Sequence, residues 1–412
     1  MTTSPTPSPT SSGGGPAPLR VAMVGHAFMG AAHSHAWRSA HRFFDLPLTP
    51  VLQVVVGRDA GRAAHAAEQY GWAGSATDWR SVVERDDVDL VDICTPGNTH
   101  RDIALAALAA GKHVLCEKPL ANSVAEAEEM AAAADEAAVR GVRAMCGFTY
   151  RRVPALSLAR ELVAEGRLGT IRHVRAQYLQ DWLSDPDTPL TWRMDKSLAG
   201  SGALGDTGAH VIDATQWITG QSITGVSGLL ETFVTSRPVA GQASGQASGQ
   251  ASGLGGVGDP AGGRGPVSVD DAALFTARFD GGAIGSFEAT RSALGRKNAI
   301  RIEINGSDGS LAFDFEDMNV LNFFDGTAPS RLQGFTRIYV TEPDHPYVGS
   351  WWPPGHGLGY EHGFTHQVVD LTRAIAAGEQ PRPSFGDALA VQRVLDAVER
   401  SAADRSTWTG VR

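Results

Sequence analysis

The sequence predicts an α/β fold in which an N-terminal parallel sheet is followed by a C-terminal α+β region built on a mostly antiparallel open sheet. Two observations lead to this prediction. Between residues 19 and 145, near-continuous apolar runs alternate with Ala-rich stretches, as expected for parallel strands with helices on both faces. After Gly147, the strand-like runs follow one another without regular helices between them, which favours antiparallel pairing.

Five strands are expected in the N-terminal part, at residues 20–24, 51–56, 88–94, 113–116 and 142–146. One helix start is marked by a capping box, because Ser123 is followed three residues later by Glu126. The helix that begins there is expected to continue to Val139.

The C-terminal part is expected to contain strands at residues 171–180, 226–235, 272–279, 283–290 and 299–304. Gly281-Gly282 separates two of these runs and predicts a hairpin turn. Helical patterns close the chain at about residues 362–377 and 387–402. Residues 237–266 are rich in Gly, Ala, Ser and Gln, so a flexible loop is expected there.

The 412 residues are enough for two domains, each with its own core. We expect a disordered tail at residues 1–18, a first domain at 19–146 and a second domain at 147–412. The net charge of −10 argues against nucleic-acid and polybasic membrane partners. The three cysteines show no metal-binding spacing, and no apolar stretch reaches the roughly 20 residues that span a bilayer. A soluble cytoplasmic protein is therefore expected.

Residues 19–30 have the strand-turn-helix pattern of a dinucleotide fingerprint. Gly25 would permit the tight turn, and Gly30 would let the following helix lie close to the strand. Ala27 replaces the usual middle glycine with the smallest residue that has a Cβ. A bound pyrophosphate would lie on the free N–H groups at the helix start. The first domain is therefore expected to be a dinucleotide-binding Rossmann domain, although the first strand of another α/β domain would look much the same.

Two further segments follow buried strands at the carboxyl edge of the sheet, where open α/β folds bind their ligands. One is the run Cys-Thr-Pro-Gly-Asn-Thr-His at residues 94–100, and the other is Cys-Glu-Lys-Pro at residues 116–119. Lys118 leaves its strand at a point from which it can reach a ligand, and Pro119 could hold it rigidly. The alternative is a solvated surface lysine.

A third segment, residues 200–213, contains Asp206 and His210. If the chain is helical from Asp206, the two side chains lie on one face and can address one substrate. The carboxylate would then raise the pKa of the imidazole toward working pH, which suits a proton shuttle. The alternative is a helix N-cap at Asp206 and a hydrogen-bonded core histidine at His210.

Together, these three segments resemble the Gfo/Idh/MocA family of glucose-fructose oxidoreductase, inositol dehydrogenase and related sugar dehydrogenases. The resemblance extends from Leu19 to the C-terminus. It implies NAD or NADP as cofactor, a sugar or polyol substrate between the domains, and a homo-oligomer, dimer or tetramer, formed through the open sheet. Residues 27–34 and 359–362 resemble the branch of the family that contains levoglucosan dehydrogenase.

The resemblance also implies roles for individual residues. Lys118 would stabilise the developing alkoxide, His210 would accept its proton, and Asp206 would orient the substrate and the imidazole. The implied cofactor contacts are Gly25, Ala27, Phe28, Met29, Gly30, Arg58, Thr95, Pro96, Asn98, His100, Glu117 and Lys118. The implied substrate contacts are Lys118, Trp182, Arg193, Asp206, His210 and His362. Trp192, Trp351, Trp352 and His356 could contact a sugar or serve packing equally well.

The choice between NAD and NADP stays open, with a slight preference for NAD from the resemblance. NAD enzymes generally place an acidic residue at the end of the second strand, whereas Gly57 and Arg58 precede Asp59 here. Arg58 or Arg62 could pair with a 2′-phosphate. Alternatively, Arg58 could stack on adenine while Asp59 binds the ribose.

No metal site is expected, because His26, His33 and His35 straddle a turn and a helix start without a matching set of carboxylates or cysteines. The expected activity is hydride transfer between a nicotinamide cofactor and a ring hydroxyl or ketone of a sugar, inositol or anhydrosugar. Two alternatives are a non-catalytic NAD(P)-binding sensor and a glycoside-cleaving enzyme that uses NAD transiently.

Overall fold

The computed structural model describes residues 16–239 and 263–412. The expected tail lies outside these residues except at its end, where the first strand already begins at Ala17. The expected loop lies outside them at residues 240–262. Its two ends pair as the antiparallel strands β9 (Ser236–Pro238) and β10 (Arg264–Pro266), so the loop prediction was wrong for residues 237–238 and 264–266.

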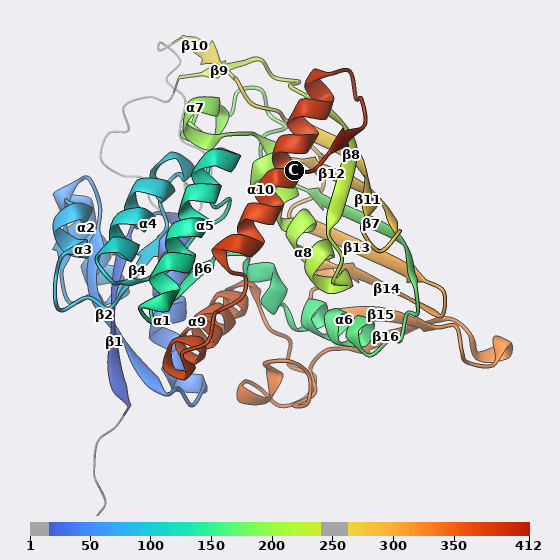
Figure 1. Ribbon diagram of the computed structural model, residues 1–412, viewed down its shortest axis with the longest axis horizontal. Helices are drawn as coiled ribbons and strands as arrows, with labels where there is room; N and C mark the ends of the chain where they lie inside the picture. The colour runs from blue at the N-terminus through green and yellow to red at the C-terminus, as the bar shows by residue number, and fades with distance from the viewer. Residues whose placement is uncertain (1–15, 240–262) are drawn as a thin grey trace, which may run out of the picture.

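The first sheet has six parallel strands in the order β3-β2-β1-β4-β5-β6 (Figure 1). This is the doubly wound Rossmann arrangement, whose strand order reverses at β1. The strands are β1 (Ala17–Val24), β2 (Leu48–Val56), β3 (Ser75–Ala76), β4 (Leu90–Ile93), β5 (His113–Cys116) and β6 (Ala144–Cys146). The connecting helices are α1 (Phe28–Phe43), α2 (Ala60–Tyr70), α3 (Trp79–Val83), α4 (His100–Ala109) and α5 (Val124–Val139). The predicted sheet is confirmed, and only the short β3 was not expected.

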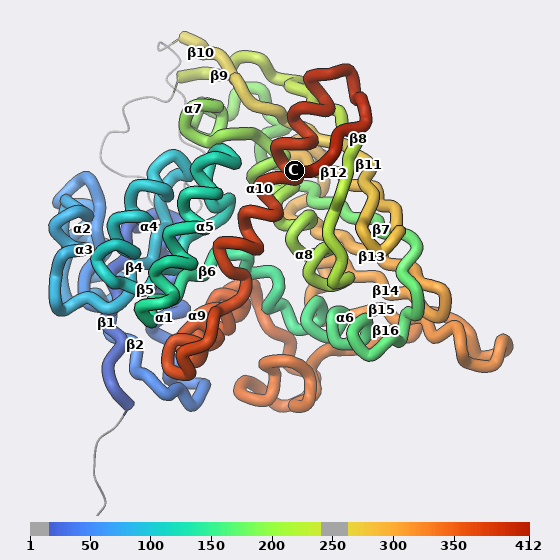
Figure 2. The backbone as a smooth tube through the Cα atoms, viewed as in Figure 1, coloured from blue at the N-terminus to red at the C-terminus, as the bar shows by residue number. Residues whose placement is uncertain are grey.

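Both faces of this sheet are covered, one of them by a helix from the far end of the chain. In β1, Ala22 and Val24 pack in the core that contains α4 and α5, whereas Val21 and Met23 pack with α1 and α9 (Tyr360–Ala377). Figure 2 shows α9 beside α1. Helix α9 therefore packs on the first sheet, although it lies far beyond the expected domain boundary at residues 146/147.

The second sheet has nine strands in the order β16-β15-β14-β13-β7-β12-β11-β8-β17. All neighbours are antiparallel except β7 and β12, so the predicted mostly antiparallel sheet is confirmed. The strands are β7 (Ile171–Leu179), β8 (Ile223–Glu231), β11 (Ala272–Phe279), β12 (Ile284–Thr290), β13 (Ala299–Gly306), β14 (Gly309–Asp314), β15 (Val320–Asp325), β16 (Phe335–Tyr339) and β17 (Thr409–Gly410).

Three helices, α6 (Pro154–Ala164), α8 (Ala209–Thr219) and α10 (Phe385–Ala403), cover one face of this sheet (Figure 1). The short α7 (Lys196–Ala199) lies in the connection that precedes α8. The expectation of no regular helices between the strand-like runs was wrong for α8, which lies between β7 and β8. Helix α8 is buried almost all round and lacks an amphipathic pattern, so no helical periodicity marks it in the sequence. On the opposite face, Leu229, Leu274 and Ile284 are exposed. No helix within residues 16–239 and 263–412 has the length and apolar character needed to cross a membrane.

Candidate active site

The turn between β1 and α1 has the geometry that a dinucleotide phosphate requires. Gly25 has a φ of +100°, and a Cβ at this position would lie 2.7 Å from the carbonyl oxygen of Cys94. A Cβ at Gly30 would collide with the carbonyl oxygen of Gly25. Helix α1 begins at Phe28, and no side chain of the described residues caps it at Ala27. Its first N–H groups are therefore available to an anion.

The segments that follow β4 and β5 lie side by side at the same edge of the sheet. His100 is buried and joins them, with Nε2 2.8 Å from the Thr95 carbonyl oxygen and Nδ1 3.0 Å from that of Pro119. Asn98 is exposed in the short 3₁₀ turn between Thr95 and His100. Met29 packs in the core on the α1 face of the sheet. Phe28 stacks on Tyr360 of α9, with ring centroids 6.2 Å apart.

Lys118 and Asp206 come together although 88 residues separate them in the sequence. The Lys118 ammonium donates to the Asp206 carbonyl oxygen at 2.7 Å and to carboxylate Oδ1 at 3.3 Å. Lys118 follows β5 in the first sheet, and Asp206 precedes α8 over the second. This contact therefore joins the carboxyl edge of the first sheet to the C-terminal part of the chain.

Asp206 is surrounded by positive charge. Its carboxylate Oδ2 lies 3.6 Å from the guanidinium of the buried Arg291. Burial raises the pKa of Asp206, but the charges of Lys118, Arg291 and Arg193 outweigh this effect and hold the pKa well below its usual range. The carboxylate therefore stays ionised and can accept hydrogen bonds from a substrate hydroxyl and from Lys118 at once.

His210 follows Asp206 on the same helical segment, but not in the expected arrangement. Residues Leu204–Gly208 form a π-helical turn that continues into α8, a feature that is frequent at functional sites. No hydrogen bond joins Asp206 to His210 in the part of the chain that the structure describes. The carboxylate was expected to raise the pKa of His210, whereas burial and the Lys118 charge lower it well below its usual value. That expectation was wrong because dehydration of the ring outweighs the carboxylate.

The surroundings of His210 are aromatic. Its ring lies 4.7 Å from the Tyr150 ring and 5.7 Å from the Tyr178 ring, measured between centroids. Tyr178 donates to Asn298 at 2.7 Å, so Tyr150 donates the 2.8 Å bond between the two phenols. Among the described residues, Nδ1 of His210 is buried without a hydrogen-bond partner. An unpaired ring nitrogen can accept a proton or a hydrogen bond from a ligand.

Tyr150, Tyr178 and Arg291 were missed by the sequence analysis. Tyr150 had a usable signal, because it lies four residues beyond β6 at the same strand edge as Lys118. Arg291 directly follows β12 and is 1% exposed, but a buried arginine cannot be recognised without its distant partner.

The other candidates lie apart from the Lys118–Asp206 contact or have structural partners. The Arg193 guanidinium lies over Trp192, and Trp182 donates to Gln180 at 3.1 Å and lies under the Arg291 guanidinium. Nδ1 of His362 accepts the N–H of Gly359 at the start of α9. Trp351 and Trp352 pack on Phe43 at the C-terminal end of α1, and His356 is exposed and contacts Pro353. An open surface pocket lined by Arg160, Tyr347 and Arg373 also lies away from the contact.

Asp59 and Arg58 follow β2 at the edge where β1 ends. Asp59 is the N-cap of α2 and accepts the Arg62 N–H at 2.8 Å, and Arg58 is exposed beside it. His26 fills the space where a Cβ of Gly57 would lie. β2 itself ends at Val56, so its last position carries no carboxylate.

Two family models match the chain. An oxidoreductase family with an NAD-binding Rossmann fold matches residues 19–145, and the C-terminal domain of the Gfo/Idh/MocA proteins matches residues 156–312. The levoglucosan dehydrogenase of Pseudarthrobacter phenanthrenivorans is 42% identical over 95% of this chain and 98% of its own length. The 1,5-anhydro-D-fructose reductase of Ensifer adhaerens is 30% identical over 62% of this chain and 66% of its own.

Solved structures agree with this result. An oxidoreductase domain protein from Kribbella flavida is 63% identical, with a TM-score of 0.90 over 96% of this chain and all of its own. A complex of levoglucosan dehydrogenase with NADH and levoglucosan is 40% identical, with a TM-score of 0.87 over 96% of this chain and 99% of its own. Fold, strand-edge turns and whole-length similarity therefore agree: this chain belongs to the Gfo/Idh/MocA family of oxidoreductases, with an N-terminal NAD-binding Rossmann domain.

Proposed function

We propose that this oxidoreductase transfers hydride between NAD(P) and a ring hydroxyl or ketone of a sugar, inositol or anhydrosugar. The observation that supports this most is the contact of Lys118 with Asp206, which joins the two halves of the chain beside the buried His210. Levoglucosan dehydrogenase and 1,5-anhydro-D-fructose reductase are named for anhydrosugars, which makes these compounds the first substrates to test.

The residues of the first sheet fit a dinucleotide. Gly25 and Gly30 leave no space for a side chain, so a phosphate can approach the backbone at the uncapped start of α1. Ala27, Phe28 and Met29 would line this turn, and Thr95, Pro96 and Asn98 would line the next one. The bound nicotinamide supplies or accepts the hydride.

The three side chains of the site would divide the remaining work. His210 is neutral at pH 7 because its pKa is lowered, so it can accept the proton of a substrate hydroxyl. The Lys118 ammonium would stabilise the negative charge that develops on the same oxygen. Asp206 would hold both Lys118 and a neighbouring hydroxyl through its ionised carboxylate. Trp182 and Arg193, which lie near Arg291 and Asp206, would also contact the sugar.

The cofactor is proposed to be NAD rather than NADP, by a small margin. One oxygen of Asp59 is engaged as the helix cap, which leaves the other for a ribose hydroxyl. The exposed Arg58 is the group that would favour NADP. If kcat/KM favours NADP by tenfold or more, about 1.4 kcal/mol, the preference for NAD is wrong.

The assembly is proposed to be a homo-oligomer formed through the open face of the second sheet. Leu229 and Leu274 are directly opposite each other on β8 and β11, and both are exposed, as is Ile284 on β12. Three unpaired cysteines, two of them buried, fit a reducing compartment such as the cytoplasm.

A panel of anhydrosugars, inositols and polyols, assayed for NADH and NADPH formation with the purified protein, tests the proposed function. Steady NADH release with one of these compounds is the expected result. Cofactor binding without turnover on any of them would instead favour a sensor. Cleavage of a glycoside without net NADH release would favour transient use of NAD.

A further inference from the structure

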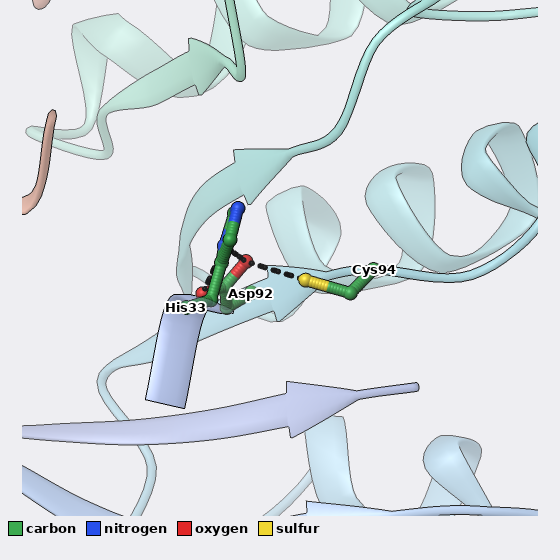
Figure 3. Close-up of side chains that lie close together, drawn as sticks. All are labelled: His33, Asp92 and Cys94. Carbon is green, nitrogen blue, oxygen red and sulfur yellow. Dashed lines mark hydrogen bonds and ion pairs between the residues drawn. The ribbon is translucent and has the colours of Figure 1, made fainter. Parts of the chain in front are cut away.

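A second buried histidine lies behind the site, between two carboxylates. His33 of α1 places Nδ1 2.9 and 3.0 Å from the two oxygens of Asp92 in β4, and Nε2 3.0 Å from Oε1 of Glu117, directly after β5. All three residues are at most 5% exposed. Figure 3 shows the His33 ring and the Cys94 thiol meeting the Asp92 carboxylate. The earlier reason for expecting no metal here was wrong, because His33 does have carboxylates and a cysteine beside it.

The pairings of this cluster are those of a protonated ring between two anions. Ionised carboxylates only accept hydrogen bonds, so a ring with an ionised carboxylate at each nitrogen donates from both and is an imidazolium. Asp92 also accepts from the Trp37 indole at 2.7 Å and from the Cys94 thiol at 3.5 Å. Its oxygens are therefore already occupied by donors, and a cation would have to displace them.

The groups around His33 agree with this protonation state. β4 presents Asp92, its end presents Cys94, the end of β5 presents Glu117, and α9 presents the Phe364 ring, at 5.4 Å between ring centroids. Burial lowers the pKa of His33, but the Asp92 charge outweighs it and raises the pKa well above its usual value. Within residues 16–239 and 263–412, the charged partners of the ring are the carboxylates of Asp92 and Glu117.

Glu117 is fixed tightly by this pairing. A Cβ at Gly147 would lie 2.5 Å from its Oε1, so the neighbouring strand end leaves just enough room for the carboxylate. The other oxygen accepts the backbone N–H of Lys118 at 3.3 Å. β5 ends at Cys116 and the chain bends at Lys118. At this bend Glu117 turns toward His33 of α1, whereas Lys118 turns toward Asp206.

We propose that His33 is a positioning residue for Lys118: by neutralising and holding Glu117 on the α1 side of the strand end, it keeps the Lys118 ammonium on Asp206. This inference rests on the proposed function of Lys118. Without the imidazolium, Asp92 and Glu117 are buried anions without a counter-charge, and the nearest cation to Glu117 along the chain is Lys118. Glu117 would then compete with Asp206 for the ammonium.

The first test needs no substrate. The chain has four lysines, so a protein labelled at lysine ¹³Cε gives a spectrum in which Lys118 can be assigned. His33→Asn should displace the Lys118 signal, and His33→Asn combined with Glu117→Gln should return it toward the wild-type position. In wild-type protein labelled at histidine ¹⁵N, both ring nitrogens of His33 should stay protonated from about pH 6 to 9. A neutral His33 in that range, or an unmoved Lys118 signal, overturns the proposal even if no substrate is found.

The second test uses turnover. His33→Asn is expected to lower kcat about 30-fold while the NAD(P) Kd changes less than about threefold. The double variant should lie within about fivefold of Glu117→Gln alone, because the uncompensated charge is gone. His35→Ala, an exposed histidine on the same helix, is the matched control and should match the wild type. A double variant no better than His33→Asn would show a merely structural role, and a parallel loss of cofactor affinity would place His33 in the cofactor turn; either result overturns the proposal.

Discussion

His33 and His210 are both buried histidines with carboxylates nearby, yet their protonation is opposite. His33 is hydrogen-bonded to Asp92 and Glu117, and its pKa lies well above the usual value. His210 faces tyrosine rings and the Lys118 charge, and its pKa lies well below. Burial lowers the pKa of both rings, so it does not account for the difference between them. Direct hydrogen bonds to anions decide it, and nearness in the sequence, as between Asp206 and His210, does not.

The largest effect on turnover is expected from replacing His210. His210→Ala is expected to lower kcat by about 10²-fold or more, because the proton acceptor is lost, with little change in melting temperature. Lys118→Ala should lower kcat similarly and also raise the pKa of His210, which moves the acid limb of residual activity to higher pH. Near-normal turnover of His210→Ala on a confirmed substrate would contradict the role, and a variant that fails to fold would identify a core histidine.

A substitution in the turn between β1 and α1 tests cofactor binding while both histidines stay in place. Gly25→Val should weaken NAD(P) binding at least about 30-fold by calorimetry, because the new Cβ meets the Cys94 carbonyl and closes the phosphate turn. Gly111→Val is the control, since Gly111 also has a positive φ but nothing within 4 Å of its Cβ. If the two variants bind NAD(P) with equal affinity, the turn at Gly25 is not part of the cofactor site.

The two histidines should also give opposite pH dependence of stability. His33 has a raised pKa, so its contribution is complete below the unfolded value near 6.5 and is lost as pH rises through the folded pKa. His33→Asn should therefore cost at least about 1 kcal/mol more at pH 6 than at pH 9 in urea unfolding. His210 has a lowered pKa, so the native state loses stability as pH falls below about 6.5, and His210→Ala removes that loss. If the free energy of unfolding changes with pH in the same way in both variants, the opposite pKa shifts assigned to the two histidines are wrong.

A smaller effect is expected at Asp206. Asp206→Asn should raise the sugar KM about fivefold, because a neutral amide holds Lys118 and a hydroxyl less strongly. The Asp206 charge raises the pKa of His210, so its loss should move the acid limb of kcat to lower pH. Movement of that limb to higher pH would mean that His210 does not control it.

The parts of the site that depend on local pattern could be predicted from the sequence. The turn at Gly25 and the strand-end position of Lys118 follow from apolar runs and their terminal residues, and both are found where expected. The π-helical turn before α8 has no such local signal, so the spacing of Asp206 and His210 was interpreted as an ordinary helix.

The pairing of His33 could not be predicted in the same way. Its partners Asp92 and Glu117 lie 59 and 84 residues away, and only the order of β1, β4 and β5 in the sheet brings them together. Strands β14, β15 and β16, at one end of the second sheet, were missed for a similar reason, since their register is defined by neighbours rather than by their own residues.

The packing of α9 on the first sheet has a consequence for how the chain matures. As the polypeptide leaves the ribosome, β1 to β6 emerge more than 200 residues before Phe364 and Val368, which complete the apolar layer on the α1 face. The nascent cofactor domain therefore exposes an incomplete apolar face until residues 360–377 have been synthesised. Docking of α9 completes this layer, so the first sheet acquires its final packing only after a segment more than 200 residues further along the chain is available.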